Sequence, residues 1–171
     1  MIHKDKKGRE LNPLICKSKI FADELNGNFD WFSGVPDSVI KNTQKHLKNF
    51  YFSSRENHSI AMAFGALLGG KKPCVLIQNS GIGLIIDSLF GLFKLYEKGL
   101  VMIISNRGTL EWEEVQHKDW GLKTKKILKV LDIKNIQFQE TGLDSIRLAK
   151  KIAYKENRIV SILIERGNLD E

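Results

Sequence analysis

The chain has 171 residues, 42% of them hydrophobic, which supports one sizeable core and is short for two, so we expect a single domain over residues 1–171. No stretch approaches the roughly 18 uninterrupted apolar residues of a membrane span, and the first residues lack the hydrophobic region of a signal peptide, so we predict a cytoplasmic protein with no membrane partner. The formal net charge of +7 suits steering of an anionic small molecule or docking to an acidic protein, and it raises the question of a nucleic-acid partner.

Apolar runs of strand length alternate along the chain with longer patterns of helical periodicity. The helices are predicted, in chain order, at residues 14–25, 38–47, 53–70, 82–96, 122–131 and 143–156. In the third of these segments the helix is predicted to begin at Glu56. The strands that alternate with them are predicted at residues 29–34, 50–54, 73–79, 99–105, 136–140 and 158–165. This alternation predicts right-handed βαβ units in a three-layer α/β/α fold, with a mostly parallel six-stranded sheet covered on both faces.

Lysines and arginines gather in two places, residues 3–9 and residues 118–129. Leucines at helical spacing separate the lysines of the second segment, a pattern typical of a solvated helix face. The sequence has no zinc-ligand spacing and no basic region with interleaved aromatic residues of the kind that stacks bases. We therefore expect no nucleic-acid partner and no metal ligand in this chain.

The two cysteines, Cys16 and Cys74, fall in a predicted helix and in a predicted buried strand. Two thiols in such elements favour reduced core residues over a disulfide framework. Neither cysteine is predicted to be catalytic.

Four turns rich in glycine, serine, asparagine and charged residues follow the first four predicted strands. They read "SGVPDS" (33–38), "SSREN" (53–57), "QNSGIG" (78–83) and "SNRG" (105–108). Ligands of open α/β sheets bind outside the carboxyl ends of the strands, so we expect the four turns to converge on one edge and form the functional site. The third turn lacks the last glycine of a dinucleotide fingerprint, and the chain has neither a P-loop nor a nucleophile elbow.

Several polar residues of these turns also suit purely structural roles. Glu56 begins a helix of small residues, where a carboxylate complements the unpaired N–H groups and the positive end of the helix dipole. The same small residues leave room for a ligand to lie close to Glu56. Asp37 and Ser38, and likewise Asn79 and Ser80, are suited to capping the helices that follow them. Both interpretations stay open from the residues alone.

The motifs "GVPDS", "REN" with the following small-residue helix, "QNSGIG", "ISNRG" and "VQH" occur in this order along the chain. Together they resemble the pyrimidine-binding domain of thiamine diphosphate-dependent 2-oxoacid decarboxylases, over about residues 21–122. Within this family the chain is similar to phosphonopyruvate decarboxylases and to the alpha subunits of sulfopyruvate decarboxylases. The resemblance implies the thiamine diphosphate-binding fold and a carboxy-lyase that converts a short anionic 2-oxo acid, sulfopyruvate or phosphonopyruvate, to an aldehyde and CO2.

The resemblance also implies roles for the residues that match the motifs of the family. Glu56 matches the glutamate that hydrogen-bonds the aminopyrimidine ring of the cofactor, and His117 matches a histidine with the chemistry for proton shuttling near neutral pH. The two are the implied catalytic residues. The implied cofactor-binding residues are Pro36, Glu56, Asn79, Ser80 and Gly81. The implied substrate-binding residues are Asp37, Ser38 and His117.

His117 follows Val115, where relatives commonly carry proline, in a segment predicted as a polar loop. A surface histidine without a catalytic role fits such a loop equally well. The role of His117 therefore stays open from the sequence.

Members of the family hold the diphosphate of the cofactor through Mg²⁺ bound at a "GDG" motif, which this chain lacks. The resemblance therefore implies that thiamine diphosphate is shared with a second subunit, which carries the diphosphate- and Mg²⁺-binding domain in a heterotetramer or a larger assembly. Two other functions remain open: a noncatalytic regulatory or scaffold subunit with the same fold, and a flavodoxin-like nucleotide-binding module.

Overall fold

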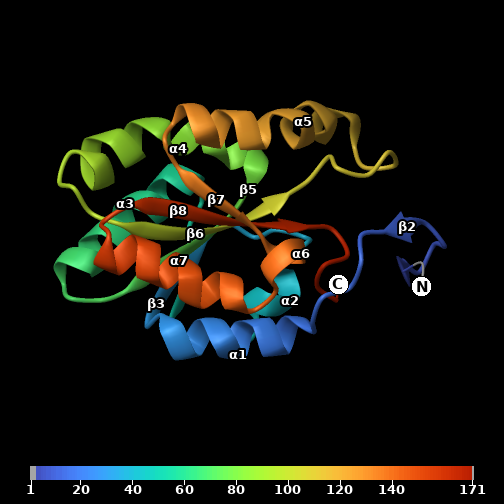
Figure 1. Cartoon of the computed structure of the whole chain (residues 1–171), viewed down its shortest axis with the longest axis horizontal. Helices are drawn as coiled ribbons and strands as arrows, with labels where there is room; N and C mark the ends of the chain where they lie inside the picture. The colour runs from blue at the N-terminus through green and yellow to red at the C-terminus, as the bar shows by residue number, and fades with distance from the viewer. Residues whose placement is uncertain (1–2, 171) are drawn as a thin grey trace.

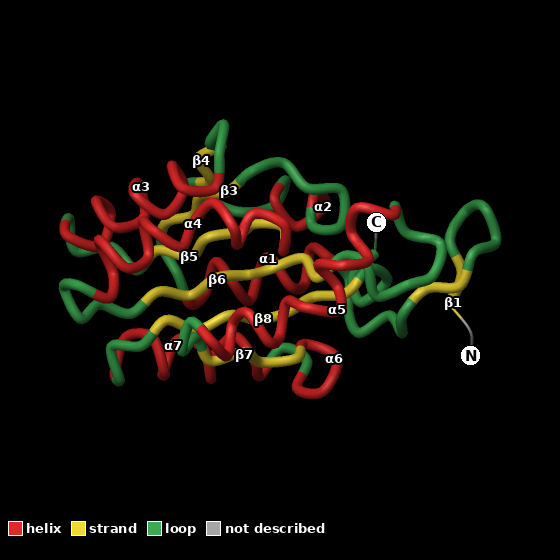
Figure 2. The backbone as a smooth tube through the Cα atoms, turned by 90° about the horizontal axis from the view of Figure 1, so that it is seen from above, coloured by secondary structure: helices red, strands yellow, loops and turns green. Residues whose placement is uncertain are grey.

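A parallel sheet of six strands forms the middle layer of the structure, a computed structural model that describes residues 3–170. The strands are β3 (Trp31–Gly34), β4 (Phe50–Phe52), β5 (Pro73–Gln78), β6 (Leu100–Asn106), β7 (Lys134–Gln137) and β8 (Ile159–Glu165). They lie in the order β4-β3-β5-β6-β8-β7, and each adjacent pair is parallel. Figure 2 shows these strands side by side, with the N-terminal hairpin of β1 (His3–Lys4) and β2 (Glu10–Leu11) outside the sheet.

Helices cover both faces of the sheet. Their bounds are α1 (Ser18–Asn28), α2 (Lys41–Gln44), α3 (Glu56–Leu68), α4 (Ile82–Ser88), α5 (Val115–Val130), α6 (Phe138–Thr141) and α7 (Asp144–Lys155). A 3₁₀ turn at Asn79–Gly81 precedes α4, and a wider π-helical segment at Leu89–Lys94 continues it. In Figure 1, α4 and α5 lie on one side of the sheet and α1 and α7 on the other. This arrangement confirms the predicted three-layer α/β/α fold.

Each face of the sheet has its own hydrophobic cluster. Because successive side chains of a strand point to opposite faces, Cys74 and Leu76 of β5 pack on the side of α1 and α7, and Val75 and Ile77 on the side of α3, α4 and α5. Every residue of β6 and β8 is buried, as expected of parallel strands covered on both faces. Cys16 and Cys74 are free thiols, and burial raises the pKa of both, so they stay protonated near neutral pH.

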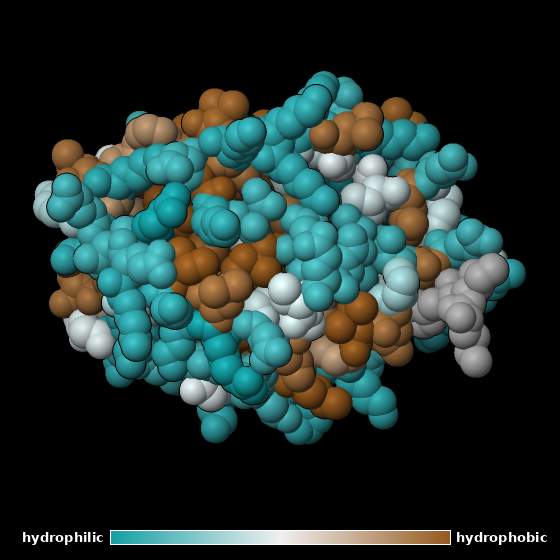
Figure 3. All heavy atoms as spheres, in the orientation of Figure 1, coloured by the Kyte–Doolittle hydropathy of each residue, from teal (hydrophilic) through white to brown (hydrophobic). Residues whose placement is uncertain are grey.

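The surface is mostly hydrophilic on the face shown in Figure 3, with apolar side chains in separate patches. The lysines of residues 118–129 are exposed along α5, and Lys123 pairs with Asp119 at 3.1 Å, which confirms the solvated helix face. Within residues 3–170, no helix combines the length and the apolar character needed to cross a membrane.

The first predicted helix begins later than expected. α1 starts at Ser18, whereas the sequence pattern places its start near residue 14. The residues before Ser18 run beside the C-terminal residues, where Cys16 forms a β-bridge with Leu169. The prediction of a helical Cys16 is therefore wrong, because pairing with a distant segment overrides the local helical pattern.

The helix predicted over residues 38–47 is shorter, since only α2 at Lys41–Gln44 is helical. Asp37 Oδ1 accepts hydrogen bonds from the backbone amides of Val39 and Ile40 at 2.8 and 3.2 Å. These bonds hold a turn directly after β3 and delay the start of the helix. Asp37 therefore caps the backbone amides of this turn, whereas α2, the helix it was predicted to cap, has no side-chain cap.

The helix predicted over residues 122–131 begins much earlier, because α5 starts at Val115. Gly121, which weakens the helical pattern, lies inside α5 against the backbone of Gly108. A Cβ atom on Gly121 would be 2.3 Å from the carbonyl oxygen of Gly108, so this glycine permits close packing and does not end the helix. The strand predicted over residues 136–140 lies earlier in the chain, since β7 runs from Lys134 to Gln137 and residues 138–140 belong to α6.

Substitution of alanine for glycine should have opposite effects on stability at two positions. A Cβ atom on Gly34 of β3 would lie 2.2 Å from the carbonyl oxygen of Leu76, so Gly34→Ala should lower the free energy of unfolding by about 1–3 kcal/mol. Gly65 lies on the exposed side of α3 with nothing within 4 Å of an added Cβ atom, so Gly65→Ala should raise stability by about 0.5–1 kcal/mol. Urea denaturation measures both shifts, and shifts of the same sign would contradict the close approach at Gly34.

Candidate functional site

The carboxyl ends of four neighbouring strands meet at one edge of the sheet. These strands, β4, β3, β5 and β6, end at Phe52, Gly34, Gln78 and Asn106, and the four predicted turns follow directly. Because the strands are adjacent and parallel, their turns lie beside one another, which confirms the predicted convergence. α5 contacts the 3₁₀ turn that follows β5 and so belongs to the same edge.

Glu56 is the first residue of α3, and its side chain lies across Gly81 in the turn after β5. A Cβ atom on Gly81 would be 2.5 Å from Glu56 Cγ and 2.7 Å from Oε1, so only glycine admits this contact. Within residues 3–170, the Glu56 carboxyl has no hydrogen-bond or ion-pair partner. Its oxygens are therefore available to a ligand, at a position where the dipole of α3 also favours negative charge.

Buried serines hold the turn that carries Glu56. Ser53 Oγ and Ser59 Oγ share a short hydrogen bond, and Ser53 Oγ also donates to the carbonyl oxygen of Arg55 at 3.0 Å. Ser33 of β3 donates to the carbonyl oxygen of Ser59 at 3.1 Å. None of these serines was a predicted site residue, yet they hold the start of α3 against the sheet.

Asn79 and Ser80 lie in the same 3₁₀ turn but have different surroundings. Asn79 is fully buried, and its side-chain amide donates three hydrogen bonds of 2.9–3.2 Å to acceptors at the end of β6 and on α5. These bonds tie the turn to its neighbours, which is a structural role. Ser80 is half-buried and accepts a hydrogen bond of 2.8 Å from Gln78 Nε2. Contact of Asn79 and Ser80 with a cofactor stays a prediction.

The turn after β3 exposes Pro36 and Ser38 and buries Asp37. One oxygen of the Asp37 carboxyl accepts the backbone amides described above, while the other, Oδ2, is buried without a hydrogen-bond partner. Such an oxygen requires a donor that the described residues do not provide. Ser38 Oγ accepts a hydrogen bond of 3.1 Å from Arg166 Nη2.

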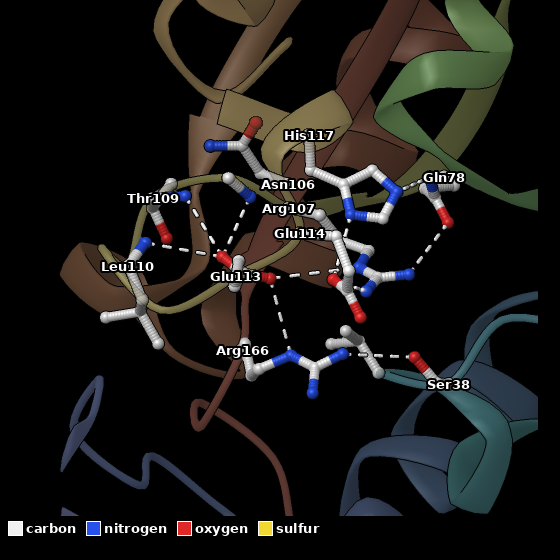
Figure 4. Close-up of polar contacts among 12 residues, drawn as sticks. Ser38, Gln78, Asn106, Arg107, Thr109, Leu110, Glu113, Glu114, His117 and Arg166 are labelled. Atoms are coloured by element: carbon white, nitrogen blue, oxygen red, sulfur yellow. Dashed lines mark hydrogen bonds and ion pairs between the residues drawn. The ribbon is translucent and has the colours of Figure 1, made fainter. Parts of the chain in front are cut away.

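His117 lies in the first turn of α5, and its side chain is only 9% exposed. Its Nδ1 is 3.1 Å from Glu114 Oε2, and its Nε2 is 3.1 Å from Gln78 Nε2 (Figure 4). The prediction of a polar loop around His117 is therefore wrong, and so is the alternative of a surface histidine. The early start of α5 turns the imidazole ring inward, to the turn after β5.

A network of charged side chains, buried except for Glu114, adjoins the histidine (Figure 4). Glu113 Oε2 accepts hydrogen bonds of 2.8–3.3 Å from the backbone amides of residues 108–110. Glu113 Oε1 lies 3.7 Å from Arg107 Nε and 3.4 Å from Arg166 Nε. Arg107 Nη2 pairs in addition with Glu114 Oε2 at 2.5 Å. Two arginines and two glutamates are thus connected at the carboxyl edge.

Two carboxyl groups of this edge have opposite pKa shifts. A hydrogen bond from its own backbone amide, and then Arg107 and His117, lower the pKa of Glu114 to about 2, so Glu114 is ionised near neutral pH. Burial raises the pKa of Glu165 at the end of β8.

The residues of this network were not among the predicted site residues. Arg107 lies inside the "ISNRG" motif, and Glu113 and Glu114 directly precede "VQH", so their place beside a motif was the available signal. Arg166 follows the last strand and had no such signal. Within residues 3–170, no three side chains of His, Cys, Asp or Glu are grouped to hold a metal ion.

The burial of Glu113 predicts a large effect of its removal. Its side chain has no exposure, and Glu113→Gln would leave Arg107 and Arg166 without their shared carboxylate, so the variant should lose about 3–5 kcal/mol of stability. The neighbouring Glu114 is 56% exposed, so Glu114→Gln should cost less than about 1 kcal/mol. Chemical denaturation compares the two variants, and equal losses would refute the dependence on the buried carboxylate.

No family model matches the chain. Three curated proteins are similar to it, and each is named sulfopyruvate decarboxylase subunit alpha. The protein of Methanocaldococcus jannaschii is 31% identical over 147 residues, which cover 82% of this chain and 87% of the relative. The protein of Methanococcus maripaludis is 32% identical over 119 residues, which cover 67% of this chain and 71% of the relative. For the protein of Methanothermobacter thermautotrophicus, the identity is 32% over 115 residues, with coverages of 66% and 69%.

A solved structure has a similar fold. It is a 2-oxoglutarate:ferredoxin oxidoreductase from Magnetococcus marinus with 2-oxoglutarate, coenzyme A and succinyl-CoA bound, and it matches with a TM-score of 0.68 and 15% identity. The match covers 88% of this chain and 28% of the larger one, and it concerns the fold alone. On its identity to the Methanocaldococcus jannaschii protein over most of both sequences, this chain belongs to the family of sulfopyruvate decarboxylase alpha subunits.

Proposed function

We propose that residues 1–171 form the pyrimidine-binding domain of a split thiamine diphosphate-dependent decarboxylase, which converts a short anionic 2-oxo acid to an aldehyde and CO2. Sulfopyruvate is the first candidate substrate because the curated relatives bear its name, and phosphonopyruvate, with a comparable anionic group, is the second. The observation that carries the proposal is the Glu56 carboxyl, which lies on Gly81 and has no partner among residues 3–170.

The surroundings of Glu56 fit an aminopyrimidine ring. The carboxyl oxygens have no partner among residues 3–170, so they can hydrogen-bond a ring nitrogen, and the absence of a side chain on Gly81 lets the carboxyl lie against the turn after β5. Ala61 and Gly65, on the exposed side of α3, add little bulk. Pro36, Asn79 and Ser80 of the neighbouring turns complete the proposed cofactor-binding set. Binding of the cofactor by this set explains the position of Glu56 better than the helix dipole alone.

Bound thiamine diphosphate supplies the electron sink that decarboxylation of a 2-oxo acid needs. The residues of this chain orient the bound molecules and move protons. Glu56 exchanges a proton with a ring nitrogen at its carboxyl group. His117 exchanges a proton on the substrate side through an imidazole nitrogen, while Asp37 and Ser38 orient the substrate.

A partner subunit completes the proposed site. The chain has no "GDG" sequence, so we assign the diphosphate group and its Mg²⁺ to a second subunit. The naming of the relatives as alpha subunits supports this division. The assembly is proposed to be a heterotetramer or larger and to act in the cytoplasm.

The divided site predicts that the purified chain is inactive alone. Isothermal titration calorimetry should show no magnesium-dependent binding of thiamine diphosphate in the micromolar range, and no 2-oxo acid should be decarboxylated. Adding the partner subunit should restore both. Micromolar binding to the isolated chain would overturn the division, and thermal stabilisation by flavin or adenine nucleotides alone would favour a flavodoxin-like module.

Glu56→Gln separates the proposed function from a structural role of the carboxylate. An amide of the same shape cannot exchange the proton, so deuterium exchange at cofactor C2 and turnover of sulfopyruvate in the reconstituted enzyme should fall by roughly 10²–10⁴-fold. A carboxylate that only complements the helix dipole predicts unchanged rates and a stability loss of about 0.3–1 kcal/mol. Glu111→Gln, in an exposed position, is the matched control and should keep both rates. An exchange rate within a few-fold of the unsubstituted enzyme would refute the proposed role of Glu56.

A further inference from the structure

Arg107 contacts both hydrogen-bond partners of His117. Its Nη2 pairs with Glu114 Oε2 at 2.5 Å, and its Nη1 donates to Gln78 Oε1 at 3.4 Å. Glu114 and Gln78 in turn hold the two imidazole nitrogens, each at 3.1 Å (Figure 4). The Arg107 side chain is 11% exposed and that of Glu114 is 56% exposed, so the guanidinium is buried while water reaches the Glu114 side of the cluster.

The donors and acceptors in this cluster determine the direction of each hydrogen bond. A guanidinium group only donates, so the Gln78 amide turns its oxygen to Arg107 and its NH₂ group to His117 and Ser80. The NH₂ group only donates, so His117 Nε2 is the acceptor. Glu114 is ionised and only accepts, so the proton of the imidazole lies on Nδ1.

We infer that Arg107 is a positioning residue, which holds His117 as the neutral Nδ1–H tautomer and leaves Nε2 as the atom that gains and loses a proton. The effect of Arg107 on catalysis rests on the proposed function, in which His117 exchanges a proton with the substrate. When Nε2 takes up a proton, the imidazolium charge faces the Glu114 carboxylate, and Gln78 must release Nε2 because two N–H groups cannot pair. When Nε2 gives the proton up, the bond from Gln78 forms again.

The charges around the ring are balanced by groups from three elements. Glu114 precedes α5, Arg107 follows β6, and Arg166 follows β8, with Glu113 between the two arginines. Gln78, from the end of β5, is uncharged. Glu114 is therefore the carboxylate in direct contact with the imidazole, and Arg107 holds that carboxylate in place.

The same network reaches the turn proposed to bind substrate. Arg166 donates to Ser38 Oγ at 3.1 Å and faces Glu113, which faces Arg107. The position of Ser38 is thus connected to the group that orients His117 (Figure 4).

A lysine cannot replace Arg107 in this role. The guanidinium presents its N–H groups in a rigid fork and donates to Glu114 and Gln78 at once, whereas an ammonium group is a single centre on a flexible stem. Arg107→Lys therefore keeps the charge opposite Glu113 and loses the simultaneous orientation of both partners of the histidine.

The experiment is nitrogen NMR of the full-length chain labelled at histidine, with the His117 signals assigned from their loss in His117→Asn. At neutral pH, His117 should show a protonated Nδ1 and an unprotonated Nε2. In Arg107→Lys the share of the Nδ1–H tautomer should fall below half. Arg158→Lys is the matched control, since Arg158 pairs with Asp132 at 3.3 Å away from this edge, and it should keep the tautomer of the unsubstituted chain.

Gln78→Glu tests the same assignment without removing Arg107. The new carboxylate still accepts from Arg107 but also accepts from Nε2, so His117 should become doubly protonated at neutral pH. An Nε2–H tautomer in the unsubstituted chain, or an unchanged tautomer in Arg107→Lys, would overturn the inference.

These spectra require neither the partner nor the cofactor, so they test the role of Arg107 independently of the proposed function. In the reconstituted enzyme, Arg107→Lys should also shift the pH profile of turnover. A changed tautomer with an unchanged pH profile would support the positioning by Arg107 and refute the proton transfer assigned to His117.

Discussion

The charge balance at Glu113 is the interaction on which the functional edge depends. Its carboxylate is fully buried, accepts three backbone amides of residues 108–110 and faces Arg107 and Arg166. A buried charge without partners costs several kcal/mol, whereas this one meets two cations and three N–H groups. The segment between β6 and α5 has no regular structure of its own, so these contacts determine its path and the place where α5 begins.

Segments from both ends of the chain brace this loop. Arg9, near the N-terminal hairpin, lies over the Trp112 ring at 3.7 Å, and Trp112 Nε1 donates to the carbonyl oxygen of Glu10 at 2.7 Å. Arg166 lies 5.4 Å from the same ring. A cation–π contact of this kind contributes about 0.5–1 kcal/mol where water reaches it. The hairpin that stands outside the sheet in Figure 2 therefore supports the loop that carries the buried network.

One short turn positions both candidate catalytic residues. Gln78 holds His117 Nε2, and Gly81, three residues later, lies under the Glu56 side chain. Asn79 between them is hydrogen-bonded to the end of β6 and to α5, so the turn is fixed to both neighbours. The spacing of the two candidate catalytic groups thus follows from the backbone of residues 78–81.

Sequence patterns by themselves determined the layer architecture, the existence of most strands and helices, and the edge at which the functional turns meet. These features follow from apolar periodicity and from turns of a few residues, which are local properties. The position of Glu56 at the start of a small-residue helix was visible for the same reason. The start of α5 was not visible in the sequence, because Gly121 weakens the helical pattern. Gly121 is required by its close contact with the backbone of Gly108, which the local pattern does not show.

Only the tertiary structure decided how the charged residues combine. Arg107 and Arg166 belong to different strand ends, and they share Glu113 because β6 and β8 are neighbours in the sheet although β7 lies between them in sequence. The extended path of Cys16 depends likewise on Leu169, at the other end of the chain. Pairings of this kind depend on strand order, which no local pattern specifies. The family and its candidate residues could therefore be predicted from the sequence, while the contacts that orient His117 could be identified only from the tertiary structure.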